Sequence, residues 1–161
     1  TPELLIVAND PAADTWLPGV PRVADRIVGA GGLGGLHAAL LHAHREVVVV
    51  AWDMPFVPAD LLRALVEHRR RFTAFAAVPV TDAPTGMEPF CACYAAACGP
   101  ALERVLHAGT HGAATFVRSL PRVSWLSRAA VEAFGDPART FLSVNTREDL
   151  ARAQSLLQPA G

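Results

Sequence analysis

A single acidic residue, Asp53, directly follows a short apolar stretch that begins with four valines at residues 47–50. Consecutive β-branched residues are typical of a strand buried on both faces, and the prolines at positions 55 and 58 could not continue a central strand. We therefore expect Asp53 at the carboxyl end of a buried strand, where open α/β sheets bind their ligands. A carboxylate there could hold Mg²⁺ together with substrate phosphates. The alternative is that Asp53 caps the following turn or helix.

Three further short polar side chains are expected near the ends of strands. Asn9 ends the apolar run 4–8, Asp25 lies just before a glycine-rich segment, and Asn145 follows the last expected strand. Together with Asp53, these side chains could converge on one crevice, where two carboxylates would suit Mg²⁺-assisted phosphoryl or nucleotidyl chemistry. Taken singly, each of them is equally well interpreted as a turn or cap residue, so the prediction depends on their joint placement.

The glycine-rich segment, residues 29–35, allows three interpretations. Its spacing matches the G-x-G-x-x-G fingerprint of dinucleotide-binding folds, and Asp53 lies about where the ribose-binding acid of such folds is expected. The preceding residues are polar where the fingerprint needs a strong strand, which weakens that interpretation. Alternatively, Gly31, Gly34 and Gly35 let backbone N–H groups approach a nucleotide at the start of the next helix. The third possibility is a flexible loop.

The histidines and cysteines do not form a recognisable metal or nucleophile motif. His37, His42 and His44 share a predicted helix without an acid at metal-site spacing, so packing or solvent exposure explains them. Three cysteines without a C-x-x-C pair predict a reduced intracellular protein, with Cys91 and Cys93 on one face of a strand. The sequence has no Gly-x-Ser-x-Gly motif that would indicate a covalent serine nucleophile.

The composition predicts one globular domain. The chain has 161 residues, of which 52% are hydrophobic and 18% charged, and its net charge is −1. A chain so close to neutral offers no overall field for nucleic acid, and no apolar run is long enough to span a membrane. We expect a cytoplasmic protein without a nucleic-acid or membrane partner. The arginines at residues 69–71 complement the C-terminal end of a predicted helix.

Strands and helices alternate along the chain, which predicts an α/β fold with a mainly parallel sheet. Thr146 and Asp149 have the spacing of a helix capping box. Strands are expected at residues 4–8, around residue 23, and at 47–50, 73–80, 90–97, 122–126 and 138–144. Helices are expected at residues 36–44, 58–71, 101–107, 113–120 and 147–157.

These segments resemble, in order and spacing, the molybdenum cofactor guanylyltransferases over essentially the whole chain. The Asp-Met-Pro-Phe and Val-Asn-Thr segments are fairly specific, and the glycine segment is less so. The matching segments are residues 7–9, Asp25 before residues 31–36, residues 52–58, residues 88–90, and residues 141–146 with 149–150.

The resemblance implies a three-layer α/β/α Rossmann-like nucleotidyltransferase fold and a Mg²⁺-dependent reaction. GTP and molybdopterin-bound molybdenum would yield the guanine dinucleotide cofactor and pyrophosphate, and other cofactor-biosynthesis proteins or the recipient apoenzyme would be partners. By position, Asp53 would be the catalytic Mg²⁺ ligand and Asp25 a guanine-nucleotide contact. Asn9 and the glycines Gly31, Gly34 and Gly35 would line the nucleotide site, and Asn145 would lie near the pterin and its phosphate.

One part of the family pattern is not matched. The family begins with a strand and a glycine-rich loop, containing arginine and lysine, that grips the triphosphate, whereas this chain has no lysine. Either this chain omits that segment or the polypeptide is not a competent enzyme by itself. We expect the former, a single domain of residues 1–161 that lacks the first strand and loop, because the run 4–8 is too apolar for an exposed edge. The alternatives are a cytidylyl or sugar-phosphate nucleotidyltransferase, and a non-catalytic nucleotide-binding domain.

Overall fold

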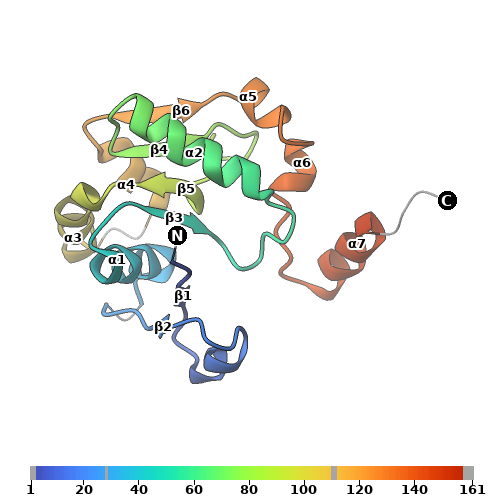
Figure 1. Ribbon diagram of the computed structural model, residues 1–161, viewed down its shortest axis with the longest axis horizontal. Coiled ribbons are helices and arrows are strands. Elements are labelled where there is room, and N and C mark those ends of the chain that lie inside the picture. The colour runs from blue at the N-terminus through green and yellow to red at the C-terminus, as the bar shows by residue number, and fades with distance from the viewer. Residues whose placement is uncertain (1–2, 28, 110–111, 158–161) are drawn as a thin grey trace.

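Strands and helices alternate along most of the chain (Figure 1). The computed structural model describes residues 3–27, 29–109 and 112–157. The strands are β1 (Ile6–Val7), β2 (Arg22–Val23), β3 (Val47–Val50), β4 (Ala76–Pro79), β5 (Cys91–Tyr94) and β6 (Val123–Leu126). The helices are α1 (Gly31–Ala43), α2 (Ala59–Arg71), α3 (Gly99–His107), α4 (Ala113–Ser119), α5 (Arg128–Glu132), α6 (Pro137–Thr140) and α7 (Arg147–Leu157), with short 3-10 helices η1 (Pro11–Thr15) and η2 (Ala96–Cys98).

The main sheet has four strands in the order β3-β5-β4-β6. Strand β5 is antiparallel to both of its neighbours, and the one parallel pair of this sheet among the described residues is β4 with β6. The expectation of a mainly parallel sheet is therefore wrong. The reason is the short connection between β4 and β5, where Val80 and Met87 form an antiparallel bridge and Gly86 turns the chain at a φ of +75°. A tight return of this kind can only join antiparallel strands, since a parallel pair needs a long crossover.

Strands β1 and β2 form a separate, parallel two-stranded sheet in which Ile6 lies opposite Arg22. Both strands contact α1, which also contacts β3, so α1 links the two sheets. Leu4, just before β1, is 61% exposed, and residues 5–8 are half-buried, so the expectation of a buried strand over the run 4–8 is wrong.

Helices cover both faces of the main sheet, which confirms the three-layer α/β/α arrangement (Figure 1). Alternate residues of β5 point to opposite faces: Ala92 and Tyr94 pack with α1, α3 and α4, whereas Cys91 and Cys93 pack with α2 and α5. The prediction that these two cysteines share one face is thus confirmed. The largest fully buried side chains of the two clusters are Tyr94, Phe116, Leu33, Leu61, Leu65 and Leu102.

Two expected elements differ from the structure. The helix expected from residue 36 begins at Gly31, so most of the glycine-rich segment is helical rather than a loop. The strand expected at residues 138–144 is absent; Asp136 caps α6 by accepting a hydrogen bond from the Ala138 N–H, with Pro137 at the first helical position. An Asp-Pro pair is a helix-start signal, and it outweighs the apolar residues that follow.

The valine strand β3 lies at an edge of the main sheet, pairing only with β5 among the described residues. Its side chains are therefore half-buried, and Val50 is 45% exposed, so the expectation of burial on both faces is wrong. An ion-pair network fixes the start of this strand, because Glu46 accepts hydrogen bonds from Arg69 and Arg70 at the end of α2. Burial raises the pKa of Glu46, but these hydrogen bonds outweigh burial and hold it below its usual value.

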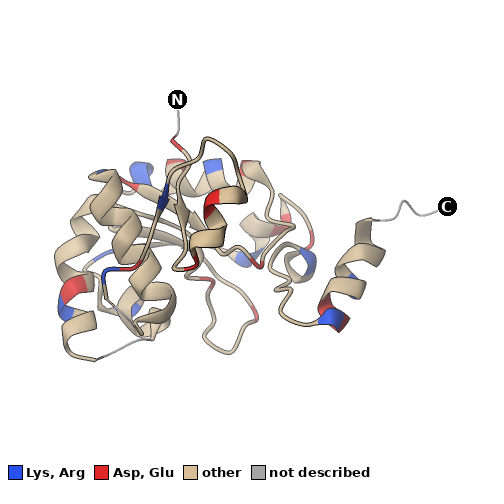
Figure 2. Cartoon of the chain, turned by 90° about the horizontal axis from the view of Figure 1, so that it is seen from below, with Lys and Arg blue, Asp and Glu red and all other residues tan. Residues whose placement is uncertain are grey.

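Helix α7 stands away from the sheet layers (Figures 1 and 2). Its start confirms the predicted capping box: the Thr146 hydroxyl accepts from the Asp149 N–H at 3.1 Å, and the Asp149 carboxylate accepts from the Thr146 N–H at 3.0 Å. These bonds hold the pKa of Asp149 below its ordinary value. Acidic and basic residues are spread over several elements rather than gathered on one (Figure 2).

Candidate functional site

Asn9 and Asp25 form a reciprocal pair beyond the ends of β1 and β2. The Asn9 side-chain amide donates to the Asp25 carboxylate at 3.1 Å, and the Asp25 backbone N–H donates to the Asn9 side-chain oxygen at 2.9 Å. Two such bonds fix both the backbone and the carboxylate of Asp25. Because β1 and β2 are parallel, their carboxyl ends lie at the same edge, which is why the sequence places these residues together.

The first turn of α1 packs against this pair. A Cβ built on Gly34 would lie 3.0 Å from the Asp25 Oδ2 atom and 3.1 Å from the Ala30 Cβ, whereas one on Gly35 would keep 3.8 Å from Asp25. Gly34 thus permits a close approach that a side chain would disturb. Gly31, the first helical residue, has a φ of +57°, which glycine adopts at little cost. The first N–H groups of an α-helix have no partner within the helix, and they lie at the positive end of its dipole, so the start of α1 is suited to a negatively charged group.

Phe90 connects this region with the main sheet. Its ring occupies the space beside Gly32, where a Cβ would overlap the Phe90 ring. Its backbone carbonyl accepts the Ala51 N–H at 2.8 Å, in the segment that carries Asp53. Phe90, the residue directly before β5, therefore ties the start of α1 to the segment after β3.

Asp53 and Asn145 meet beyond the end of β3, although they lie far apart in the sequence. The Asn145 side-chain amide donates to Asp53 Oδ2 at 3.2 Å, and the Val144 N–H donates to the Asp53 backbone carbonyl at 2.9 Å. Within the described residues, no protein group donates to the other carboxylate oxygen of Asp53. That oxygen is therefore available to a cation or a substrate.

A second carboxylate, Glu88, lies near Asp53 and was not selected as a site residue from the sequence. Burial and the Asp53 charge raise the pKa of Glu88, opposed by a hydrogen bond from the Phe90 N–H to its carboxylate at 3.4 Å. The signal available in the sequence was an acid directly before Pro89 at the start of a buried strand.

The four predicted polar residues thus gather as two pairs, Asn9 with Asp25 and Asp53 with Asn145. No direct contact joins one pair to the other among the hydrogen bonds of the described residues. The predicted convergence is therefore found within each pair but not between the pairs. Phe90 contacts both regions, because its ring lies beside Gly32 and its carbonyl accepts the Ala51 N–H.

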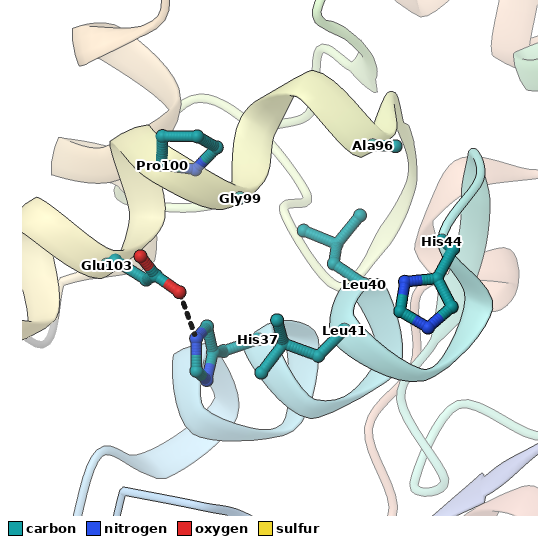
Figure 3. A pocket seen from close by; sticks show the side chains of 8 residues that line it. All are labelled: His37, Leu40, Leu41, His44, Ala96, Gly99, Pro100 and Glu103. Carbon is teal, nitrogen blue, oxygen red and sulfur yellow. Dashed lines mark hydrogen bonds and ion pairs between the residues drawn. The ribbon is translucent and has the colours of Figure 1, made fainter.

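A hollow of about 340 Å³ lies elsewhere, between α1 and the η2–α3 segment (Figure 3). His37 lines it and approaches Glu103 with its Nε2 atom 3.4 Å from a carboxylate oxygen. None of the predicted site residues is part of its lining. Because the chemistry predicted from the sequence depends on carboxylates at strand ends, the two pairs rather than this hollow are the candidate site.

Arg139 is brought to the loop that follows Asp53. Its guanidinium carbon lies 5.1 Å from the centroid of the Phe56 ring, a cation–π distance.

Within the described part of the chain, no cluster of three or more His, Cys, Asp or Glu side chains could hold a metal ion. A cation at Asp53 would therefore need further ligands from a substrate. No helix in that part of the chain is long and apolar enough to cross a bilayer.

Residues 1–123 match the MobA-like NTP transferase domain family. The chain belongs to this family. It is 33% identical to a probable molybdenum cofactor guanylyltransferase of Pelotomaculum thermopropionicum, over 87% of this chain and 66% of that protein. It is 32% identical to the molybdenum cofactor guanylyltransferase of Syntrophotalea carbinolica, over 93% of this chain and 70% of that protein. The chain thus spans about two thirds of the length of these family members.

Solved structures confirm the nucleotidyltransferase fold. The molybdopterin-guanine dinucleotide biosynthesis protein A of Archaeoglobus fulgidus superposes with a TM-score of 0.80 at 28% identity, covering 94% of this chain and 77% of that one. The 2-C-methyl-D-erythritol 4-phosphate cytidylyltransferase of Thermus thermophilus superposes with a TM-score of 0.68 at 22% identity, covering 96% and 81%. The latter likeness supports the fold alone.

Proposed function

We propose that this chain carries a guanylyltransferase activity that transfers GMP from GTP to molybdopterin-bound molybdenum. The products are the guanine dinucleotide cofactor and pyrophosphate. Membership of the MobA-like family and the named activities of its relatives support this reaction class. The observation that carries the assignment to a site is the Asp53–Asn145 pair beyond the end of β3, where one Asp53 oxygen has no donor among the described residues and a second carboxylate, Glu88, lies near.

The nucleotide is assigned to the Asn9–Asp25 side. A carboxylate can accept hydrogen bonds from the N1–H and 2-amino groups of guanine, and Asn9 holds Asp25 in a fixed orientation for that contact. The close approach of Gly34 and the amino-terminal N–H groups of α1 at Gly31 allow the nucleotide backbone to lie near the helix start. Gly35 packs on the same side, where an added Cβ would make ordinary van der Waals contacts.

Asp53 fits a Mg²⁺ ligand of the kind that shares the ion with substrate phosphates. Mg²⁺ usually keeps several waters and binds one or two carboxylates, which suits a site where no three-residue metal cluster is present among the described residues. Such an ion supplies charge neutralisation at the phosphates. Asn145 orients the Asp53 carboxylate by its amide hydrogen bond and so keeps the second oxygen directed away.

In the proposed reaction an oxygen of the acceptor's terminal phosphate attacks the α-phosphorus of GTP. The new P–O bond forms as the bond to the β-phosphate breaks, and pyrophosphate leaves. Asn145 and Arg139 lie on the side of the Asp53 loop assigned to the acceptor, where the Arg139 guanidinium could leave Phe56 to contact a phosphate.

A nucleotide panel tests this proposal. Pyrophosphate release is measured with GTP, CTP, UTP or ATP and a molybdopterin-bound molybdenum acceptor, with and without a chelator of divalent cations. We expect release with GTP only, and its loss on chelation. A preference for CTP or UTP would instead support another nucleotidyltransferase. Nucleotide binding without release would support a non-catalytic domain.

A further inference from the structure

Two exposed tryptophans meet beside the candidate site. Trp52, the residue directly before Asp53, is 84% exposed, and Trp16, just after η1, is 52% exposed. Their ring centroids lie 6.5 Å apart with an angle of 34° between the rings. They come from the segments that follow β3 and β1, so the pair bridges the strand ends that carry Asp53 and Asn9.

The two rings form an exposed aromatic surface on which a flat ring can stack. A centroid distance of 6.5 Å with an angle of 34° is that of two aromatic rings packed directly on one another, so a ligand would stack on the exposed surface of the pair and not between the rings. Because Trp52 is 84% exposed, a planar heterocycle can lie on its ring with little repacking.

The location indicates which ring would enter. Guanine is assigned to the Asn9–Asp25 pair, whose carboxylate can read the hydrogen-bonding edge of the base. Trp52 is covalently next to Asp53, which is bonded to Asn145 on the side assigned to the acceptor. The acceptor of the proposed reaction carries a pterin, a flat heteroaromatic ring whose faces can stack on aromatic side chains as nucleobases do.

We propose that Trp52 and Trp16 form a stacking platform that binds the pterin ring of the acceptor and positions its phosphate near Asp53. This inference rests on the proposed function for the identity of the ring, and the stacking chemistry itself is that of any flat heterocycle. The platform would give the acceptor an anchor that is independent of its phosphate charge, which matters in a chain without lysine.

Intrinsic fluorescence offers a direct test, because the chain has three tryptophans and the third, Trp125 on β6, is 43% exposed and distant in the fold. Pterin-6-carboxylate and GTP are titrated separately into the unaltered chain and into the Trp52→Ala, Trp52→Phe and Trp125→Ala variants. Binding is followed by calorimetry as well as by quenching. The Trp52→Ala change removes an exposed side chain, so folding should be retained.

We expect Trp52→Ala to weaken binding of pterin-6-carboxylate about ten-fold or more, the size of one lost base-stacking contact. GTP affinity and the Trp125→Ala variant should be unchanged, and Trp52→Phe should restore most of the affinity. An unchanged pterin affinity in Trp52→Ala would overturn the platform. A loss of GTP affinity in place of pterin affinity would overturn the assignment to the acceptor.

The outcome separates this inference from the proposed function. Pterin binding that depends on Trp52 in a chain that releases no pyrophosphate would retain the platform and refute the transferase assignment. Pyrophosphate release with an unchanged acceptor KM in Trp52→Ala would retain the transferase and refute the platform.

Discussion

The Asn9–Asp25 pair and the Asp53–Asn145 pair each combine an amide with a carboxylate, but the structure holds them differently. Asn9 makes two hydrogen bonds to Asp25, one to its carboxylate and one from its backbone N–H. Asn145 makes a single side-chain bond to Asp53, and the second link is between backbone groups. In both pairs the amide binds one carboxylate oxygen, Oδ2, and no group among the described residues donates to the other; the first pair differs in that Asn9 also holds the backbone N–H of Asp25.

This difference suggests different tasks. A fixed carboxylate packed against Gly34 suits recognition of a ligand with a defined shape. A carboxylate that has a second one, Glu88, near it suits a cation, because Mg²⁺ is commonly held by one or two carboxylates. The comparison predicts that substitutions in the first region change substrate affinity and those in the second change the rate of the chemical step.

The largest expected effect is that of Asp53→Asn. It removes the negative charge but keeps the side-chain shape, so kcat should fall about 100-fold or more while the KM for GTP changes little. The matched variant Asp25→Asn should raise the KM for GTP with a smaller effect on kcat. Steady-state kinetics of pyrophosphate release measure both. Equal effects on kcat would remove the distinction between the two regions.

Gly32→Ala is expected to have the largest effect on stability, because its Cβ would overlap the Phe90 ring that joins the two regions. We expect a loss of about 1–3 kcal/mol in the free energy of unfolding, as for overpacking in other cores. Urea unfolding provides the measurement. The double variant Gly32→Ala with Phe90→Leu should recover part of the loss, and simple additivity would argue against the contact.

Gly34→Ala and Gly35→Ala form a matched pair that sharpens the assignment of the first region. A methyl group at Gly34 would press on Asp25, so we expect a several-fold higher KM for GTP. At Gly35 the nearest atom would be the Val7 Cγ1 at 3.6 Å, so alanine should fit and stabilise α1 by about 0.5–1 kcal/mol. Thermal unfolding and kinetics of both variants check this. If both raise the KM alike, the space beside Asp25 does not matter.

Glu88→Gln should have the smallest effect, and its sign depends on pH. The raised pKa means that the folded state keeps the Glu88 proton to a higher pH than the unfolded state does. The ionised form of Glu88 therefore destabilises the folded state increasingly as the pH rises from the unfolded-state pKa through the folded-state pKa. We expect Glu88→Gln to raise the Tm at pH 7 by a few degrees at most, and to change it little at pH 3.5. A decrease in Tm at pH 7 would show that the Glu88 charge stabilises the fold.

Much of the fold followed from local signals in the sequence. Residues 59–71 and 147–157 form helices as predicted, because apolar spacing, a preceding proline and the Thr146–Asp149 capping box all agree. The pairing of the strands could not be predicted from such local signals. Nothing in the apolar run of β5 tells whether it joins the sheet parallel or antiparallel, since that depends on the turn at Gly86.

The candidate site was predictable as a set of residues but not as an arrangement. The strand-end rule selected Asn9, Asp25, Asp53 and Asn145, yet it could not assign them to two pairs, because that depends on the placement of one sheet relative to the other. The glycines were expected in a loop because glycine is a poor helix former. In the structure their small size allows α1 to approach Asp25 and Phe90 closely.

The burial of all three cysteines has a practical consequence for labelling. Cys91, Cys93 and Cys98 are unpaired and buried, and burial raises the pKa of their thiols to about 12, 11 and 12. At neutral pH they are almost entirely protonated and out of reach of reagents. One cysteine introduced on the surface, for example on α7, would therefore react selectively without removal of the native thiols. Fluorescence transfer from the tryptophan pair to a dye on that cysteine could then follow substrate binding.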